Sequence, residues 1–280
     1  MNGTAPFTLN DLRAARTTGA KLAMLTCYDY TTARLLDEAG VPMLLVGDSA
    51  SSVILGHAST LPVSLDFLIE ITAAVKRGAT RSLVMGDMPF GSYQEDDAQG
   101  VRNVVRMIKE TNCDCVKLEA GVSSTSLVSR LADAGVAVIA HLGLRPQAVG
   151  LMGGYKFQGR TRAEADAIVS LAVQFSHAGA AGLLLEAVPN EVSAKIVQAT
   201  DVPVIGCGAG AACHAHVVVL QDLLRQTPRQ PKFVPKVDLS ASLIETARSY
   251  VNMIERGAYP DAAHSYEMPA DEKSKFLAGD

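Results

Sequence analysis

Short runs of apolar residues recur along the chain, and each run stops abruptly at a polar side chain. Residues 43–46 read Met-Leu-Leu-Val, and Gly47 and Asp48 follow directly. A short unbroken apolar run is typical of a strand buried on both faces of a parallel sheet. Similar runs end at Asp87, Glu119, His141 and Glu186. Because the parallel strands of a barrel all end on one face, we expect these five side chains to converge on one site.

Three more strands are predicted at residues 22–28, 202–207 and 217–220, which makes eight in all. Segments with helical periodicity alternate with the strands, at residues 8–18, 31–39, 65–77, 96–111, 123–134, 162–178, 190–199 and 240–256. Eight strands alternating with helices predict an α/β fold, a (β/α)8 TIM barrel with a short N-terminal helix. A doubly wound open sheet is the alternative, although no dinucleotide-binding glycine fingerprint follows the first strand.

We expect one barrel domain over residues 1–280, with a helical extension at 1–20 and a loop-like C-terminal tail at 257–280. The net charge of −4 and the lack of a basic block argue against nucleic acid as a partner. The apolar runs are too short to span a membrane, and the N-terminus lacks the long apolar region of a secretory signal. Five cysteines, an odd number, favour reduced thiols and a cytoplasmic protein.

Three of the predicted strand ends carry carboxylates on consecutive strands. Asp48, Asp87 and Glu119 end the second, third and fourth strands. Neighbouring strand ends can gather such groups around a hard cation, and Mg²⁺ prefers oxygen ligands. The alternative is that these acids cap helices or lie on the surface.

Lys117 lies two residues before Glu119, so both side chains point to the same side of their strand. Inside the barrel the lysine could pair with carboxylates and polarise a substrate oxygen, or it could form an ion pair that is only structural. His141 is a supporting group or a structural histidine. Glu186 could act as a general base or acid, or as a helix-capping acid before Pro189.

Several longer motifs resemble those of the ketopantoate hydroxymethyltransferase family, from about residue 21 to residue 265. They are TCYDY at 26–30, LVGDS at 45–49, GH at 56–57, STLPV at 59–63, VKLE at 116–119, HLGLRPQ at 141–147, GGYKFQGR at 153–160 and VPVIG at 202–206. The resemblance implies a (β/α)8 barrel of the phosphoenolpyruvate mutase and isocitrate lyase superfamily. It also implies transfer of a hydroxymethyl group from 5,10-methylenetetrahydrofolate to 3-methyl-2-oxobutanoate with Mg²⁺, giving 2-dehydropantoate for pantothenate synthesis.

The same resemblance implies roles for individual residues. Asp48, Asp87 and Glu119 correspond to the metal-site acids of the family. The groups that hold the 2-oxo acid would be Asp48, Ser49, Asp87 and Lys117, and Glu186 would be the catalytic proton acceptor. The resemblance also implies a homo-oligomer, commonly a decamer, whose partners are a small 2-oxo acid and a folate.

The chain departs from the family's usual pattern at 50–52, 213–216, Ala187 and Gln221. The segments 50–52 and 213–216, and Gln221, are expected near the barrel mouth, which puts substrate or folate preference in doubt. One alternative function is therefore a Mg²⁺-dependent lyase or aldolase of the same superfamily acting on another 2-oxo acid. A catalytically silent paralogue is a second alternative, but it would be expected to have lost one of the four acids, and all four are present.

Overall fold

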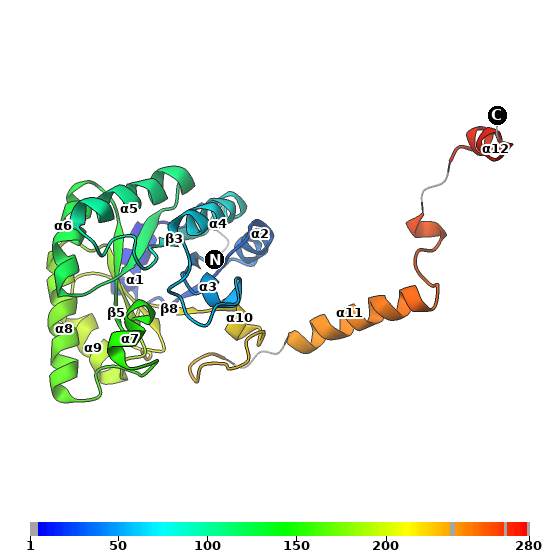
Figure 1. Ribbon diagram of the computed structural model, residues 1–280. Coiled ribbons are helices and arrows are strands. Elements are labelled where there is room, and N and C mark those ends of the chain that lie inside the picture. The colour runs from blue at the N-terminus through cyan, green and yellow to red at the C-terminus, as the bar shows by residue number, and fades with distance from the viewer. Residues whose placement is uncertain (1–4, 236–238, 266–267, 279–280) are drawn as a thin grey trace.

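The computed structural model describes residues 5–235, 239–265 and 268–278. Eight parallel strands pair in chain order and close into a barrel, which confirms the predicted fold (Figure 1). The strands are β1 (Leu22–Thr26), β2 (Met43–Val46), β3 (Leu83–Asp87), β4 (Cys115–Glu119), β5 (Val138–Gly143), β6 (Gly182–Glu186), β7 (Val204–Cys207) and β8 (Ala215–Val218).

Helices connect the strands from β1 to β7 and lie around the barrel, whereas β7 and β8 are joined by the described residues 208–214 without a helix and the last helices of the chain follow β8. The longer ones are α1 (Leu9–Thr18), α2 (Tyr30–Glu38), α4 (Leu65–Gly78), α5 (Asp97–Thr111), α6 (Thr125–Asp133), α8 (Arg162–His177), α9 (Asn190–Ala199), α11 (Ser240–Glu255) and α12 (Ala270–Ala278). Short helical turns are α3 (Ala50–Val53), α7 (Val149–Met152), α10 (Leu220–Leu223), η1 (Val122–Ser124), η2 (Pro146–Ala148) and η3 (Ala262–His264). Side-chain caps explain several starts, since Ser64 accepts from the N–H of Phe67 and Asp96 from that of Gln99.

Several predicted boundaries are shifted, and the first and seventh strands are shorter than predicted. The eighth strand starts two residues earlier than predicted, because Ala215 pairs with Leu22 on one side and with Ile205 on the other. The tail from residue 257, predicted to be loop-like, contains η3 and the helix α12. Residues 270–278 include several good helix formers, and their helix propensity accounts for α12 although the segment before it is irregular.

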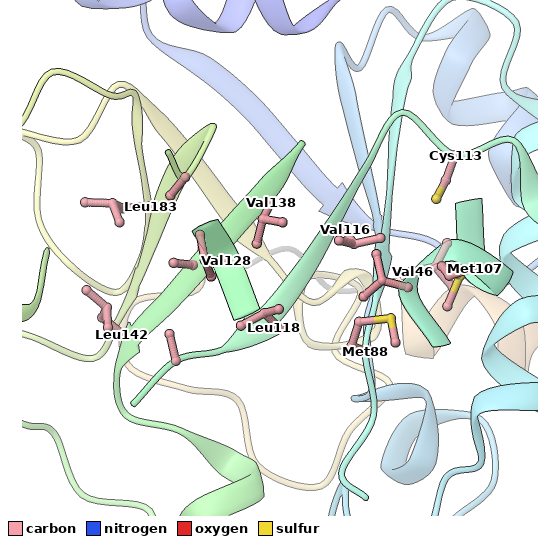
Figure 2. Close-up of a cluster of buried hydrophobic side chains, with 14 of the residues drawn as sticks. Val46, Met88, Met107, Cys113, Val116, Leu118, Val128, Val138, Leu142 and Leu183 are labelled. Atoms are coloured by element: carbon pink, nitrogen blue, oxygen red, sulfur yellow. The ribbon is translucent and has the colours of Figure 1, made fainter. Parts of the chain in front are cut away.

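Strand residues alternate between two apolar layers. Val46, Val116, Leu118, Val138 and Leu183 belong to the outer layer, between the sheet and the helices (Figure 2). The intervening residues fill the barrel and form a separate inner cluster. This alternation decides which strand-end side chains reach the lumen.

The two ends of the barrel differ. Leu12 and Ala15 of α1 join the inner cluster, so this helix packs against the N-terminal ends of the strands. The predicted N-terminal helix therefore closes one end and leaves the C-terminal end for a site.

After β8 the chain leaves the barrel. The helices α11 and α12 extend away from it, and no residue of α11 is buried (Figure 1). Across the described ranges, no helix has the length and apolar character needed to cross a membrane.

Candidate active site

The inner residues of four strands end in polar side chains at the C-terminal face. The inner series of β4 runs Cys115, Lys117, Glu119, and that of β3 ends at Asp87. By the same alternation His141 ends the inner series of β5 and Glu186 that of β6. The side chain of Lys117 therefore points into the lumen of the barrel and not toward the helices.

These side chains line one cavity of about 150 Å³. Its polar wall contains the residues predicted from the sequence, namely Asp48, Ser49, Asp87, Lys117, Glu119, His141 and Glu186. Apolar residues line the same cavity, mainly Leu45, Leu184, Val217, Val219 and Phe233. The cavity therefore offers both charged groups and apolar surface.

Three carboxylates surround a single ammonium group. Lys117 Nζ lies 2.9 Å from Asp87 Oδ1, and the backbone N–H of Asp48 donates to Asp87 Oδ2 at 2.8 Å. The exposed fractions of Asp48, Asp87, Lys117 and Glu119 are 5%, 0%, 4% and 6%. Removing this many charges from water is costly unless they are paired.

The pKa values of these groups reflect the excess of buried carboxylates over ammonium groups. Burial raises the pKa of Asp87 to about 7, with Lys117 opposing and Asp48 adding to the shift. Burial also raises the pKa of Glu119 to about 8. Burial disfavours the charged form of Lys117, but the nearby carboxylates outweigh it and raise the pKa of this lysine. One lysine does not offset three buried acids, so this donor set suits an additional cation.

The carboxylates are not yet arranged as a complete metal site. In the described ranges, no three His, Cys, Asp or Glu side chains gather closely enough to hold a metal ion between them. Both oxygens of Glu119 instead accept from the backbone N–H of Gln147, at 3.2 and 3.1 Å. Small side-chain movements would therefore be needed for all three acids to reach one ion.

His141 lies between Lys117 and Glu186. Its Nδ1 is 3.5 Å from Lys117 Nζ, and its Nε2 is 3.3 Å from Glu186 Oε2. Burial, with the Lys117 charge adding to it, lowers the pKa of His141, so the ring is neutral at pH 7. Because an ammonium group only donates, Nδ1 is the acceptor and the ring proton lies on Nε2, toward Glu186.

The approach of His141 to Glu186 is not aligned as a hydrogen bond in this state. Contacts of this kind often tighten when substrate binds. Glu186 is held by its backbone, since Leu144 N–H donates to its carbonyl at 2.8 Å. Gly143, at φ 89°, permits this approach, because a Cβ there would lie 2.3 Å from the Glu186 carbonyl oxygen.

Ser49 lies beside the cavity with its hydroxyl 2.7 Å from the hydroxyl of Tyr28. Tyr93 and Gln147 form a second buried contact behind the carboxylates, at 2.8 Å. Sequence reasoning assigned no role to Tyr28, Tyr93 or Gln147. Tyr28 and Gln147 lie inside motifs that carry the family resemblance, and this membership was a signal that could have pointed to them. Their hydrogen-bond partners are distant in sequence, so the contacts themselves could not be predicted.

The divergent segment 213–216 does not lie at the mouth, so that expectation is wrong. His214 Nδ1 accepts from the N–H of Val204, the first residue of β7, and Lys21 Nζ donates to the carbonyl of Cys213 at 2.7 Å. These contacts place the segment at the N-terminal end of the strands. Its effect on substrate choice through direct contact is therefore excluded.

Comparison with known proteins agrees with the motifs. A family model described as ketopantoate hydroxymethyltransferase matches residues 6–262. A protein of Thermobifida fusca (strain YX), named 3-methyl-2-oxobutanoate hydroxymethyltransferase, is 45% identical over 260 residues, which cover 92% of this chain and 93% of the relative. A protein of the same name from Oleidesulfovibrio alaskensis is 42% identical over 275 residues, covering 98% and 95%.

Solved structures are similar in fold. A phosphoenolpyruvate phosphomutase from Streptomyces platensis subsp. rosaceus superposes with a TM-score of 0.61 at 15% identity, covering 97% of this chain and 95% of that one. A phosphonopyruvate hydrolase in complex with oxalate and Mg²⁺ gives a TM-score of 0.61 at 14% identity, with the same coverage. The family model and the relatives, which span nearly the whole chain, show that this chain belongs to the ketopantoate hydroxymethyltransferase family.

Proposed function

We propose that this protein is a Mg²⁺-dependent enzyme that transfers a hydroxymethyl group from 5,10-methylenetetrahydrofolate to 3-methyl-2-oxobutanoate, giving 2-dehydropantoate in pantothenate synthesis. The observation that carries the proposal is the excess of buried carboxylates over ammonium groups in the cavity that Glu186 also lines. The relatives, named as 3-methyl-2-oxobutanoate hydroxymethyltransferases, suggest the substrate. A neighbour of the same fold is described with oxalate, a small dicarboxylate, and Mg²⁺.

Asp48, Asp87 and Glu119 would hold the metal ion. Their fit to a hard cation rests on oxygen ligands, on burial and on the raised pKa values of Asp87 and Glu119, since a nearby positive charge would favour their ionised forms. When bound, Mg²⁺ would supply positive charge that stabilises an enolate of the 2-oxo acid.

Lys117, Ser49, Asp48 and Asp87 are proposed to orient the 2-oxo acid. The ammonium group of Lys117 attracts the anionic end of the substrate, and the Ser49 hydroxyl can donate to it. The branched alkyl end would then contact apolar residues of the cavity such as Leu184, which precedes Glu186 on the inner face of β6. This orientation brings the C3–H bond toward the Glu186 side of the cavity.

Glu186 is proposed to accept the C3 proton. Neutral His141 directs its Nε2–H toward this carboxylate and so supports it without adding a full positive charge. The electron pair of the broken C–H bond moves into the enolate. Water releases the one-carbon unit from the folate as formaldehyde, the C–N bonds break and tetrahydrofolate leaves. The enolate C3 then adds to the formaldehyde carbon, and the resulting alkoxide takes up the proton held by Glu186.

The proposed assembly is a homo-oligomer, with a decamer as the expected form, acting in the cytoplasm. Leu243, Ala247, Tyr250, Val251 and Ile254 fall on one stripe of α11, and none of them is buried in the single chain. An apolar stripe of this length on a helix that extends from its barrel is typical of a contact with another chain. All five cysteines are free thiols, as expected for a reducing compartment.

The proposal is tested by measuring 2-dehydropantoate formation with 3-methyl-2-oxobutanoate, Mg²⁺ and 5,10-methylenetetrahydrofolate, omitting each in turn. We expect product only in the complete mixture. Turnover of another 2-oxo acid without folate, and no product from the complete mixture, would instead identify the lyase or aldolase alternative. The absence of any turnover would support the silent paralogue.

A further inference from the structure

The side chain of Gln147 connects groups that the proposed reaction requires. Gln147 lies in η2, after β5, and is 6% exposed. Its Nε2 donates to Asp48 Oδ2 at 2.9 Å and to the carbonyl of Met88 at 3.0 Å. Its backbone N–H donates to both oxygens of Glu119. One residue therefore restrains two of the three acids, although they belong to loops and strands far apart in sequence.

Tyr93 fixes the orientation of the Gln147 amide. The Tyr93 hydroxyl lies 2.8 Å from Gln147 Oε1, and it accepts from the backbone N–H of Glu119 at 3.0 Å. The Met88 carbonyl and the Asp48 carboxylate only accept, so the amide nitrogen of Gln147 faces them and Oε1 faces Tyr93. The single hydroxyl proton of Tyr93 is shared between this Oε1 and the carbonyl of Glu119, at 2.8 and 3.2 Å.

The position of the backbone donor follows from local structure. Pro146 occupies the first turn of η2, and the N–H groups of a first helical turn have no partner within the helix. The N–H of Gln147 is therefore free to bind the Glu119 carboxylate. The backbone N–H of Gln147 binds Glu119, while its side-chain amide binds Asp48.

We propose that Gln147 is a positioning residue, whose side-chain amide holds Asp48 in place for a divalent cation and is itself held in orientation by Tyr93. This inference rests on the proposed function, in which Asp48 binds Mg²⁺. The hydrogen bond to Asp48 Oδ2 leaves Oδ1 for a ligand and prevents the side chain from turning away. Groups that orient metal ligands in this manner typically contribute 10–100-fold to metal affinity.

The test is Gln147→Met, which keeps the length of the side chain and removes its amide, with Mg²⁺ binding measured by isothermal titration calorimetry. We expect the dissociation constant to rise roughly 10–100-fold. The melting temperature without metal should fall by only a few degrees. Excess Mg²⁺ should restore much of the lost activity, which a general folding defect would not permit.

Two further variants keep the proposal open to contradiction. Tyr93→Phe removes the hydroxyl that orients the amide, and we expect a smaller loss of Mg²⁺ affinity than in Gln147→Met. Gln174→Met is the matched control, because Gln174 is an exposed residue of α8 and its side-chain amide contacts only Ser170 among the described hydrogen bonds, at 3.3 Å. The Mg²⁺ dissociation constant of this variant should stay within roughly threefold of the parent value, which is smaller than the roughly 10–100-fold change expected when a group that orients a metal ligand is removed.

The outcomes separate the two proposals. If Mg²⁺ binds the parent and Gln147→Met equally well, the positioning role is wrong and the proposed function stands. If the parent itself binds no Mg²⁺, the metal site fails, and the role of Gln147 fails with it.

Discussion

The barrel buries aspartate and glutamate side chains at both of its ends, but in opposite electrostatic environments. At the N-terminal end, Asp37 of α2 accepts hydrogen bonds from the backbone and side chain of Ser82, from Arg81 and from Thr80. Although burial opposes ionisation, these bonds outweigh it and lower the pKa of Asp37 to about 2. At the C-terminal end, burial raises the pKa values of Asp87 and Glu119 to about 7 and 8.

The comparison shows that burial alone does not decide what an acid does. Asp37 and Glu119 are both 6% exposed, but Asp37 lies near the surface beside the half-exposed Arg81 and accepts several fixed hydrogen bonds, so its position and its donors together keep it ionised. A carboxylate with several fixed donors stabilises the fold. Carboxylates that share one lysine are held ready for a ligand, at a cost to the stability of the unliganded protein.

The largest expected effect is at Glu186. Glu186→Gln keeps the shape of the side chain and removes its ability to accept a proton. Exchange of the C3 proton of 3-methyl-2-oxobutanoate should slow by roughly 10²–10⁴-fold, the usual contribution of a positioned base. The rate is followed by proton NMR in D₂O with Mg²⁺. Exchange at the parental rate would show that another group removes the proton.

A second effect is expected at Glu119. Glu119→Gln removes one carboxylate from the proposed metal site, and Mg²⁺ affinity should fall by roughly 100-fold, because ligand charge strongly affects binding of hard cations. Calorimetric titration measures the affinity. The pKa of Glu119 is raised in the folded protein, so ionisation of this side chain opposes folding as the pH rises from about 4.5 to about 8. At pH 8 and without metal, the variant should therefore unfold at a urea concentration no lower than the parent. A clear loss of stability would contradict the comparison.

Asp37→Asn is expected to lower the stability of the fold and to leave Mg²⁺ affinity unchanged, the opposite of what we expect for Glu119→Gln. This variant places an amide among donors that require an acceptor, and the free energy of unfolding at pH 7 should fall by about 2–3 kcal/mol. Mg²⁺ affinity should not change, because Asp37 lies at the other end of the barrel. Urea unfolding and calorimetry on the same preparation test both statements.

Asp37 also predicts a pH dependence. Its folded pKa of about 2 lies below its ordinary value of 3.8, so the folded state binds fewer protons. The stabilisation is therefore complete above about pH 4 and is lost as the pH falls through about 2. The stability difference between parent and Asp37→Asn should shrink over this range, and a constant difference would contradict the assignment.

The smallest effect is expected for Tyr28→Phe. The variant removes the hydroxyl that lies 2.7 Å from the Ser49 hydroxyl and so frees the latter to rotate. The KM for 3-methyl-2-oxobutanoate should rise by about 3–10-fold with kcat nearly unchanged, consistent with about 1 kcal/mol for a neutral hydrogen bond. A larger fall in kcat would mean that Tyr28 contributes to the chemical step.

The fold and the lumen-facing acids were predictable because alternation along a strand is a local property. Lys117 and Glu119 share a side by spacing alone, and Gly47 and Asp48 mark where a strand ends. The network of Gln147 was not predictable in this way, since its partners Asp48 and Met88 lie about a hundred and about sixty positions earlier in the chain. The position of segment 213–216 was missed because it was assigned to the loop at the C-terminal end of the seventh strand, whereas it leads into β8 and so lies at the N-terminal end of the barrel.

The most direct test of the central claim is proton NMR of 3-methyl-2-oxobutanoate in D₂O with the parent protein, with Mg²⁺ and with EDTA. The claim is that the acids at the C-terminal end bind Mg²⁺ and that Glu186 removes the C3 proton beside it. The C3 proton signal should disappear with Mg²⁺ and persist with EDTA, in each case with 5,10-methylenetetrahydrofolate absent and then present. Equal exchange in EDTA, or no exchange and no 2-dehydropantoate with Mg²⁺ and folate together, would contradict the account.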